Sequence, residues 1–500
     1  MERLTRLGLT IGAAALFAGC SALQSPIGTP GATAIDKRTA TSPFPAANLT
    51  FLLTDGSLLL QAGSGNWYRC VPDARGDYSN GACSQAASLP QGYDPYGYAS
   101  QVLADGRLVI SGGEENRGNF KLTNAGAIYD PVANTWTPLG HPRGWSWIGD
   151  SPSSMLPDER MLMGQKLTKE DAYLDPTTLR WHHLADAGKS DINSEEGWTL
   201  LPDGTILTVD LDAVSQADNS EIYNPATGQW KSAGSTIVQL ASPGQDRCIR
   251  YARHRCYRPA GEIGPAMLRP DGTVFATGSW TGSSPYTGAG HTAIYHTHGR
   301  LSGTWTAGPD FPNGDFAADA YAILEPSGNV LVFGVYGVYE WNGKTFKEVQ
   351  GLKDTGAPEL LPTGQVIMLG EGVTVYTPRG SPQTSWAPTI KTCPSTIAPG
   401  KTYEITGTQF NGLSQAAAFG DENQNATSFP LVRITNDASG HVFYARTHDH
   451  STMGIATGAK LVWTYFDVPT GIEDGNSKLV VIANGIASKP VRVTVSVASR

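Results

Sequence analysis

Residues 266–278 read AMLRPDGTVFATG, which is an apolar run, the pair Asp271-Gly272 and a second apolar run. An Asp-Gly pair between apolar runs is the strongest short signal of a β-hairpin, because both residue types tolerate the positive φ angles of a two-residue turn. We therefore predict two antiparallel strands here, joined by a turn with positive φ at both positions.

The same pattern recurs along most of the chain. Seven apolar segments end at a two-residue turn and resume as apolar segments, at intervals of 36 to 68 residues. A Tyr and a later aromatic residue follow in most units, for example Tyr129 with Trp136 and, in the last unit, Tyr376 with Trp386. Each unit thus offers four strands. The seven turns are Asp55-Gly56, Asp105-Gly106, Asp158-Glu159, Asp203-Gly204, Asp271-Gly272, Ser327-Gly328 and Thr363-Gly364.

A four-stranded unit of this size cannot cover its own faces. Seven such units stacked around an axis can, with the aromatic residues filling the space between neighbours. Residues 43–388 therefore predict a seven-bladed β-propeller. Residues 389–500 carry further short strands, separated by turn signals at the intervals of an immunoglobulin-like β-sandwich. The predicted fold class is all-β.

The repeated units resemble kelch repeats. The order of a propeller followed by a sandwich is similar to that of galactose oxidase and its bacterial relatives, and the resemblance covers Pro43–Val495. It implies a kelch-type propeller with a galactose oxidase-like C-terminal domain. Kelch propellers serve many functions, so the resemblance alone does not predict a reaction.

Galactose oxidase holds copper at the axial mouth of its propeller, and the resemblance implies where such ligands would fall here. The slot of the Tyr–His pair falls near Asp354-Thr355. Tyr96 or Tyr98 fits a position just before an inner strand, but no Cys is placed to link to it. The copper-radical site is therefore not intact in the sequence, and whether the protein is an enzyme stays open.

The residues just before the first strand of each unit are expected to face the mouth of the propeller. Four of them are acidic: Asp150, Glu196, Glu262 and Asp319. We predict that they form a ring that binds a cation or a hydroxyl-rich ligand, with Trp147 and Tyr98 nearby as further contacts. The alternative is that each acid only caps amides of its own loop. The Trp residues, in turn, pack between blades in most propellers.

His448 and His450 flank Asp449 in the C-terminal domain. Residues i and i+2 of an extended strand share a face, so both imidazoles can bind one metal ion. If this loop reaches the mouth, the acidic ring supplies a third ligand, and copper or calcium is the expected ion. The alternative is a pair of hydrogen-bonded histidines that fix the loop.

The N-terminus predicts export. Residues 1–20 read as a lipoprotein signal peptide in which Cys20 is lipidated, and residues 21–42 read as a flexible tether. The predicted localisation of the protein is the bacterial cell envelope, at the outer membrane in a Gram-negative host. Cys70 with Cys83 and Cys248 with Cys256 are predicted disulfides, as suits an oxidising compartment.

The amino-acid composition limits the classes of partner that the protein can bind. The net charge is −9 and only 16% of residues are charged, which excludes the basic footprint of a nucleic-acid binder. The basic run from Arg247 to Arg258 is either a solvated loop insertion or a binding site for an anion. We expect a monomer that recognises a glycan or an envelope protein at the mouth. The alternatives are an oxidase of the galactose/glyoxal oxidase class with altered ligands, and a structural envelope scaffold.

Overall fold

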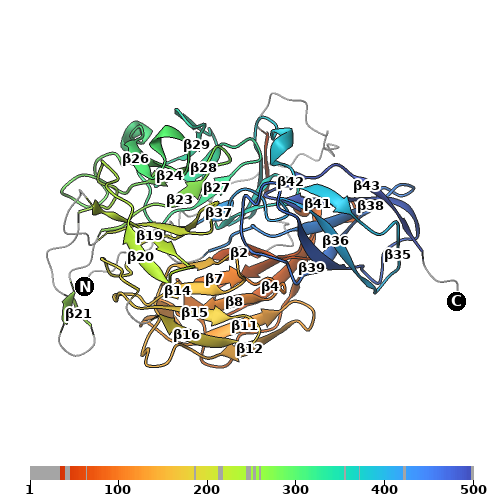
Figure 1. Ribbon diagram of the computed structural model, residues 1–500, viewed down its shortest axis with the longest axis horizontal. Coiled ribbons are helices and arrows are strands. Elements are labelled where there is room, and N and C mark those ends of the chain that lie inside the picture. Colours follow the sequence, from red (N-terminus) through yellow and green to blue (C-terminus); the bar gives the residue numbers. More distant parts are fainter. Residues whose placement is uncertain are drawn as a thin grey trace.

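The computed structural model describes residues 34–39, 45–63, 65–184, 187–211, 218–243, 249–251, 255–257, 261–353, 356–370, 372–420 and 424–496. Its described residues are almost entirely β-strand and turn, as predicted (Figure 1). The helical segments among them are four short 3-10 turns, η1 (Tyr78–Asn80), η3 (Gly299–Leu301), η4 (Pro312–Gly314) and η5 (Thr384–Trp386).

Seven antiparallel sheets, each with a core of four strands, match the seven predicted hairpin units one to one. The first two are β2 (Leu49–Leu52), β3 (Leu58–Gln61), β4 (Trp67–Val71), β5 (Ala82–Gln85), then β7 (Ala99–Val102), β8 (Leu108–Ser111), β11 (Gly126–Asp130), β12 (Thr135–Leu139). The next two are β13 (Ser153–Met155), β14 (Met161–Gly164), β15 (Asp171–Asp175), β16 (Arg180–Leu184), then β17 (Thr199–Leu200), β18 (Ile206–Val209), β19 (Ser220–Asn224), β20 (Gln229–Ser232).

The remaining three sheets follow the same pattern. They are β23 (Ala266–Leu268), β24 (Thr273–Thr277), β25 (Thr292–His296), β26 (Thr304–Ala307), then β27 (Ala322–Leu324), β28 (Val330–Phe333), β29 (Val338–Trp341), β30 (Phe346–Glu348), and finally β31 (Pro358–Leu360), β32 (Val366–Leu369), β33 (Gly372–Thr377) with β1 (Ala34–Thr39). The first strands of successive sheets contact one another, for example β7 with β13, β17 with β23 and β31 with β2. The architecture is consistent with a β-propeller.

Aromatic side chains fill the space between neighbouring sheets. Trp67 on β4 lies 4.8 Å from Trp136 on β12, and Phe275 on β24 stacks on Trp341 of β29 at 4.7 Å. These rings are almost fully buried. Packing between sheets, rather than ligand contact, is therefore the role of these tryptophans.

The hairpin turns differ from the predicted type. In the first, the Gly56 N–H donates to the Leu53 carbonyl and Leu53 N–H donates to the Ser57 carbonyl, and the other six turns repeat both bonds. Only the last turn residue has positive φ, at +74° in Gly56. This is a type I turn closed by a left-handed residue. The prediction of two positive φ angles is wrong because the Asp55 side chain accepts the Ser57 N–H, which holds Asp in the right-handed region.

The last sheet is completed by the N-terminal strand. β1 pairs antiparallel with β33 over its whole length, from Ala34 with Thr377 to Thr39 with Gly372. The tether predicted for residues 21–42 is therefore wrong over Ala34–Thr39, and the fourth strand expected at Trp386 is instead the 3-10 turn η5. An N-terminal strand supplies the outer edge and so joins the two ends of the propeller.

The C-terminal domain is a β-sandwich of the predicted kind (Figure 1). Its strands are β34 (Thr389–Thr392), β35 (Thr396–Ile397), β36 (Thr402–Thr408), β38 (Leu431–Asn436), β39 (Val442–His448), β40 (Val462–Asp467), β41 (Gly475–Ala483), β42 (Ile486–Ala487) and β43 (Val491–Val495). The sandwich encloses its own core, which includes Ile405, Phe466 and Val481. Residue Cys393 is a half-buried free thiol whose pKa burial raises to about 11.

One segment of the sandwich domain enters the propeller. β37 (Ala417–Ala418) pairs with β27, and the neighbouring Gln415 side chain accepts the Leu200 N–H at 2.8 Å. Further along, the Asn425 amide donates to the Pro358 carbonyl at 2.9 Å. These partners belong to the innermost strands of separate sheets, so the described parts of this segment, residues 411–420 and 424–429, lie along the axis.

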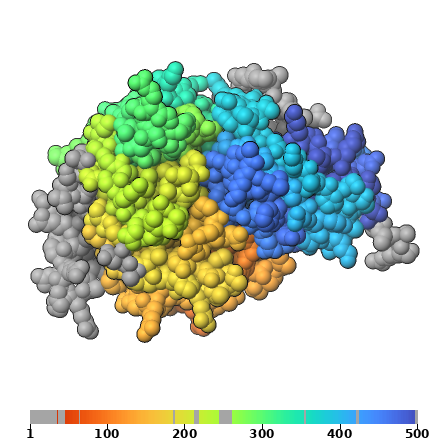
Figure 2. Space-filling view, viewed as in Figure 1, coloured from red at the N-terminus to blue at the C-terminus, as the bar shows by residue number. Residues whose placement is uncertain are grey.

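The body of the sandwich packs against the end of the propeller that carries the seven turns. Arg446 donates to the Asp105 carbonyl at 2.6 Å, and the Thr452 hydroxyl donates to the Pro157 carbonyl at 2.7 Å. A side chain at Gly56 would collide with the Tyr444 ring, because a Cβ there would lie 2.5 Å from it. Figure 2 shows the blue C-terminal domain against the orange, yellow and cyan parts of the propeller.

Smaller features complete the described chain. The predicted Cys70–Cys83 disulfide is confirmed, and it joins β4 to β5. A small sheet of β6 (Pro95–Tyr96), β9 (Glu115–Asn116) and β10 (Asn119–Phe120) follows β8, and β21 (Ile249–Tyr251) pairs with β22 (Arg255–Tyr257) in the basic run. Within the described part of the chain, no helix is long and apolar enough to cross a membrane.

Candidate functional site at the propeller mouth

The inner strands begin at the end of the propeller that faces away from the sandwich, and we call this end the mouth. Each inner strand runs from the mouth to a turn, and several of these turns, such as those at Gly56 and Gly106, contact the sandwich. Residues that directly precede an inner strand therefore lie at the mouth. Five acidic residues, which we call the mouth acids, gather there: Glu114, Asp150, Glu195, Glu262 and Asp319.

A buried lysine lies among the mouth acids. Lys166, which follows β14, places its ammonium 2.7 Å from Asp150 and 2.5 Å from Glu195. The Lys166 side chain is only 4% exposed. Two carboxylates and one ammonium thus form a network that spans the loops before β13 and β17, so Lys166 holds two of the mouth acids in place.

The other acids raise one another's pKa. Burial, followed by the charges of Asp150 and Glu195, raises the pKa of Glu114 to about 9. Burial also raises the pKa of Asp150 to about 6, although Lys166 opposes the shift. At neutral pH Glu114 is therefore protonated and can donate a hydrogen bond, while most of Asp150 is ionised and accepts one.

Asp319 and Glu262 complete the far side of the mouth. Surrounding protein, followed by the charge of Glu195, raises the pKa of Asp319, whereas a hydrogen bond with Glu262 lowers it. A hydrogen bond between two carboxyl groups requires a proton on one of them. The Asp319 side chain is nevertheless open to water at the mouth, so solvent screens these charges. A ligand can reach Asp319 directly.

The predicted ring is only partly correct. Asp150, Glu262 and Asp319 do meet at the mouth, but Glu196 is fully buried and faces Lys189, with Nζ 3.0 Å from its Oε1. The neighbouring Glu195 takes its place. The chain bends at Glu195, and of the two adjacent acids Glu195 pairs with Lys166 while Glu196 pairs with Lys189. Burial raises the pKa of Glu196 to about 7.

The segment that enters the propeller reaches the mouth at Gly420. The Gly420 carbonyl lies so close to Gly197 that a Cβ at Gly197 would be 2.5 Å from it. Residues 421–423 lie outside the described residues. Gly420, which belongs to the C-terminal domain, therefore lies beside Gly197 and the backbone of Asp319, a contact that sequence reasoning did not predict. The small residues around β37 are the only signal of such close packing.

The two predicted aromatic contacts differ in position. Trp147 is half-buried and its indole N–H donates to the Lys166 carbonyl at 2.8 Å, which places it next to the lysine of the mouth. Tyr98 is fully buried, and its hydroxyl donates to Gln61 at 2.7 Å. The prediction that Tyr98 contacts a ligand is therefore wrong, because its inner-strand position turns it into the core. Tyr286 interacts with Glu262 and Asp319 and adds an aromatic edge to the mouth.

His448 and His450 do not form the predicted pair. His448 is the last residue of β39, and Asp449 has a φ of +50°, so the chain is not extended between the two histidines. The nitrogens of His448 bond Asp449 at 2.8 Å and Asp467 at 3.2 Å, while His450 bonds Thr464. Burial lowers the pKa of His450 to about 3.

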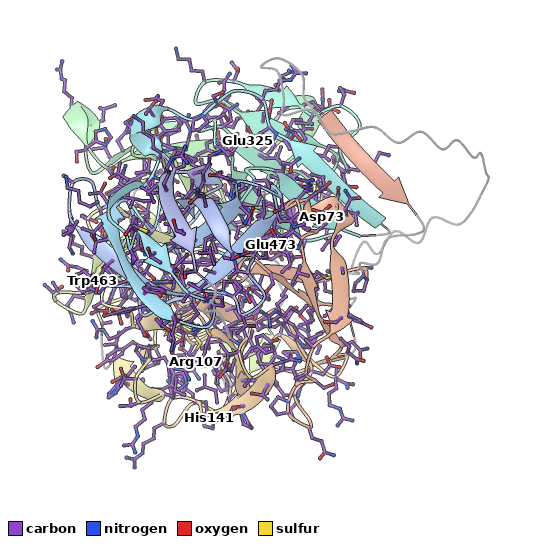
Figure 3. All side chains as sticks on the ribbon, turned by 90° about the vertical axis from the view of Figure 1, so that its right-hand side faces the viewer. Asp73, Arg107, His141, Glu325, Trp463 and Glu473 are labelled. Carbon is purple, nitrogen blue, oxygen red and sulfur yellow. A yellow bond between two sulfur atoms is a disulfide. The ribbon has the colours of Figure 1, made fainter. Side chains whose placement is uncertain are left out.

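The same loop also lies at the wrong end of the molecule for the mouth. His450 lines a groove of about 520 Å³ between the sandwich and the turn end of the propeller, together with Arg107 and Trp463. Figure 3 views the molecule from the side of the C-terminal domain and labels Arg107 and Trp463. The mouth acids therefore supply no third ligand to these histidines.

The mouth does not fit the copper site that the resemblance implies. Among the described residues, the groups that gather around Lys166 are carboxylates, whereas that site needs tyrosine and histidine ligands. The sequence of the segment that enters the propeller, residues 409–430, contains no histidine. Two remaining sequence predictions, the lipidated Cys20 and the Cys248–Cys256 pair, lie outside the described residues or side chains, as do Asp354-Thr355.

Comparisons with known proteins give only distant similarities. No family model matches the chain, and neither does any curated protein. One similar solved structure is a fungal AA5-family alcohol oxidase in complex with copper, with 12% identity, a TM-score of 0.48, and coverage of 94% of this chain and 100% of that one.

Two further structures are more distant still. The extracellular domain of a putative one-component system from B. thetaiotaomicron has 9% identity and a TM-score of 0.44, covering 93% of this chain and 59% of that one. A virginiamycin B lyase from Staphylococcus aureus also has 9% identity and a TM-score of 0.44, covering 69% of this chain and 100% of that one. Function must therefore be argued from the residues of this protein.

Proposed function

We propose that this protein is an exported, lipid-anchored binding protein that recognises a saccharide at the propeller mouth. One observation carries the proposal: acidic side chains from the loops of separate sheets converge at one end of the propeller, around the ammonium of Lys166. Glu114 offers a donor and Asp150 an acceptor, which suits hydroxyl groups that both donate and accept.

The surroundings of the mouth acids support a sugar rather than a simple ion. Trp147 and Tyr286 are only partly buried, and the Tyr336 side chain beside Tyr286 is 67% exposed. Aromatic faces next to carboxyl groups provide both stacking and hydrogen bonding to a sugar ring. Lys166 neutralises part of the acidic charge and Glu114 is protonated at neutral pH, so the charge of the mouth is smaller than its five carboxyl groups suggest.

Export and anchoring rest on separate observations. The Cys70–Cys83 disulfide supports an oxidising compartment, and the sequence of residues 1–20 supports lipidation at Cys20. Because β1 completes the last sheet, the tether is confined to the residues before Ala34. A chain that hangs from its N-terminus in this way leaves the mouth accessible to soluble or surface glycans.

The test is binding of the protein from Ser21 onward to a glycan array. The proposal predicts binding to a defined set of saccharides, which Asp319→Asn together with Glu195→Gln reduces at least tenfold, since each lost charged hydrogen bond weakens binding by roughly 1.5–3 kcal/mol. Asp449→Asn, in the groove at the opposite end, serves as the matched control. Loss of binding in the control, or unchanged binding in the mouth variant, refutes the proposal.

A further inference from the structure

A second acidic cluster lies beside the mouth, inside the wall of the propeller. Four carboxylates surround the ammonium of Lys189, which is 3.0 Å from Glu196, 3.5 Å from Glu221 and 4.0 Å from Asp210, and Asp191 is the fourth. The Lys189 side chain is completely buried. With four carboxylates at −4 and one ammonium at +1, the ionised cluster carries −3. A further positive charge would offset this buried negative charge, as a proton on one of the carboxyl groups also would.

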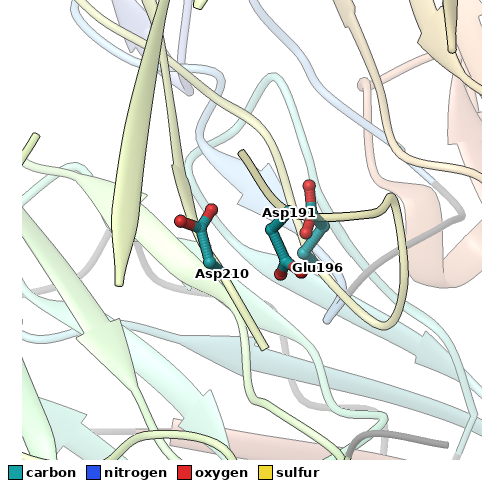
Figure 4. Close-up of side chains that lie close together, drawn as sticks. All are labelled: Asp191, Glu196 and Asp210. Atoms are coloured by element: carbon teal, nitrogen blue, oxygen red, sulfur yellow. The ribbon is translucent and has the colours of Figure 1, made fainter. Parts of the chain in front are cut away.

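Three of these carboxylates face one another. One oxygen from each of Asp191, Glu196 and Asp210 lies within 4.8 Å of the others, and all three residues are buried (Figure 4). Two oxygens on opposite sides of a calcium ion are about 4.6–5.2 Å apart, because each Ca–O distance is about 2.3–2.6 Å. The three oxygens therefore fit around one ion of this size.

The fourth carboxylate is already satisfied. Glu221 accepts the Ser190 N–H at 2.8 Å and pairs with Lys189, and so it fixes the loop that carries Asp191. Glu196 uses Oε1 to accept from Lys189 and from the Trp198 indole, while its Oε2 is buried and accepts no hydrogen bond. Hydrogen bonds from the protein thus hold one oxygen of Glu196, and the other receives none from the described residues.

The burial of Asp210 without hydrogen-bond partners points to a ligand. Its side chain is almost fully buried, yet neither carboxylate oxygen accepts a hydrogen bond from any described residue, and Lys189 Nζ is 4.0 Å from Oδ1. Leaving a buried carboxylate without hydrogen bonds is costly, so native structures place a partner at such a group. Asp210 comes from the end of β18, across from the loop of the other two ligands (Figure 4).

We propose that Asp191, Glu196 and Asp210 bind a divalent cation of the calcium type, next to the ammonium of Lys189. The three ligands are hard oxygen donors, which calcium prefers over the softer metals. A dication reduces the charge of the four carboxylates and Lys189 from −3 to −1. The ion ties the loop before β17 to β18, and the same loop carries Glu195 to the mouth.

The test is terbium luminescence on the protein from Ser21 onward, which keeps every strand of the structure. Terbium replaces calcium at oxygen sites and emits when a nearby tryptophan is excited. Trp198 bonds the ligand Glu196 at 3.3 Å, so it is the expected sensitiser. We expect saturable emission that millimolar calcium reverses and that Trp198→Phe lowers at least severalfold.

Two substitutions locate the ion. Asp210→Asn is expected to weaken terbium binding at least tenfold, and Asp191→Asn to do the same, whereas Asp319→Asn at the mouth leaves it unchanged. Equilibrium dialysis with calcium repeats the comparison without a tryptophan, and circular dichroism confirms that each variant is folded. No terbium or calcium bound by the native protein, binding that both ligand variants retain, or binding lost only in Asp319→Asn would each overturn the proposal.

Discussion

Replacing Lys166 with methionine removes its ammonium from the mouth. Methionine keeps most of the side-chain volume, so the change is mainly one of charge. Asp150 is then left buried with no counter-ion, and its Oδ1 already lacks a hydrogen bond. Breaking a buried ion pair in this way costs about 3–5 kcal/mol. Because Glu195 is 26% exposed and can turn to water, we place the loss near the lower end, at about 3 kcal/mol.

The loss must depend on pH in a defined direction. Asp150 has a folded-state pKa near 6, above its unfolded value, and removal of Lys166 raises it further. A group with a raised pKa favours the folded state at low pH and loses that contribution as the pH rises through the folded pKa. Lys166→Met is therefore most destabilising at pH 8 and least at pH 5, where the Asp150 carboxyl is neutral.

The assay is urea unfolding of the native protein and the variant at pH 5 and pH 8, followed by tryptophan fluorescence. Asp150→Asn in the Lys166→Met background is the matched rescue, because it removes the unpaired charge without changing the shape. We expect the double variant to recover about half of the lost free energy. A loss below about 1 kcal/mol at pH 8, or a larger loss at pH 5 than at pH 8, would show that the network does not hold the mouth together.

Three further predictions concern the fold. A chain that starts at Thr41 lacks β1 and exposes the edge of β33, so we expect its free energy of unfolding to fall by about 3 kcal/mol or more. A chain that starts at Gly31 keeps β1 and should be almost unaffected. Equal stability of the two truncated chains would refute the closure by β1. Glu159 is the only non-glycine among the seven turn residues with positive φ, at +73°. Glu159→Gly should therefore increase the free energy of unfolding by about 1 kcal/mol and raise the melting temperature, and a lower melting temperature would contradict the turn geometry. Burial raises the pKa of Glu359 well above its usual value, so ionisation of this carboxyl should lower the stability of the native protein as the pH rises above the unfolded-state pKa of about 4.3, and Glu359→Gln should make the fall of stability with pH shallower; an unchanged slope in the variant would contradict this assignment.

Most of the architecture can be predicted from local patterns. Each Asp-Gly or related pair marks one hairpin, because the turn residues and the flanking apolar strands act within a dozen residues of each other. Local patterns do not predict the fourth strand of the last sheet. Its fourth strand lies more than 300 residues away in sequence, and the strand is an edge with no strong apolar alternation, so nothing local links Ile35 to Tyr376.

The acidic site at the mouth is harder to predict, because it too depends on residues that are far apart in the sequence. Positions before the inner strands correctly indicate which loops reach the mouth, but the choice between Glu195 and Glu196 depends on a bend of the chain at Glu195. Glu114 and Lys166 follow second strands, so a search restricted to residues before first strands cannot find them. The segment around β37 pairs across domains, and its sequence shows only small residues and a glycine.

The location of the bound saccharide tests the central proposal most directly. Carboxyl groups of the protein from Ser21 onward are labelled with a carbodiimide and glycine ethyl ester, with and without a saccharide found on the array, and are quantified by mass spectrometry. Asp319 and Glu195 are accessible enough to react, as is Asp449 at the opposite end. We predict protection of Asp319 and Glu195 and unchanged labelling of Asp449. Protection of Asp449 with unchanged labelling at the mouth would contradict the proposed site.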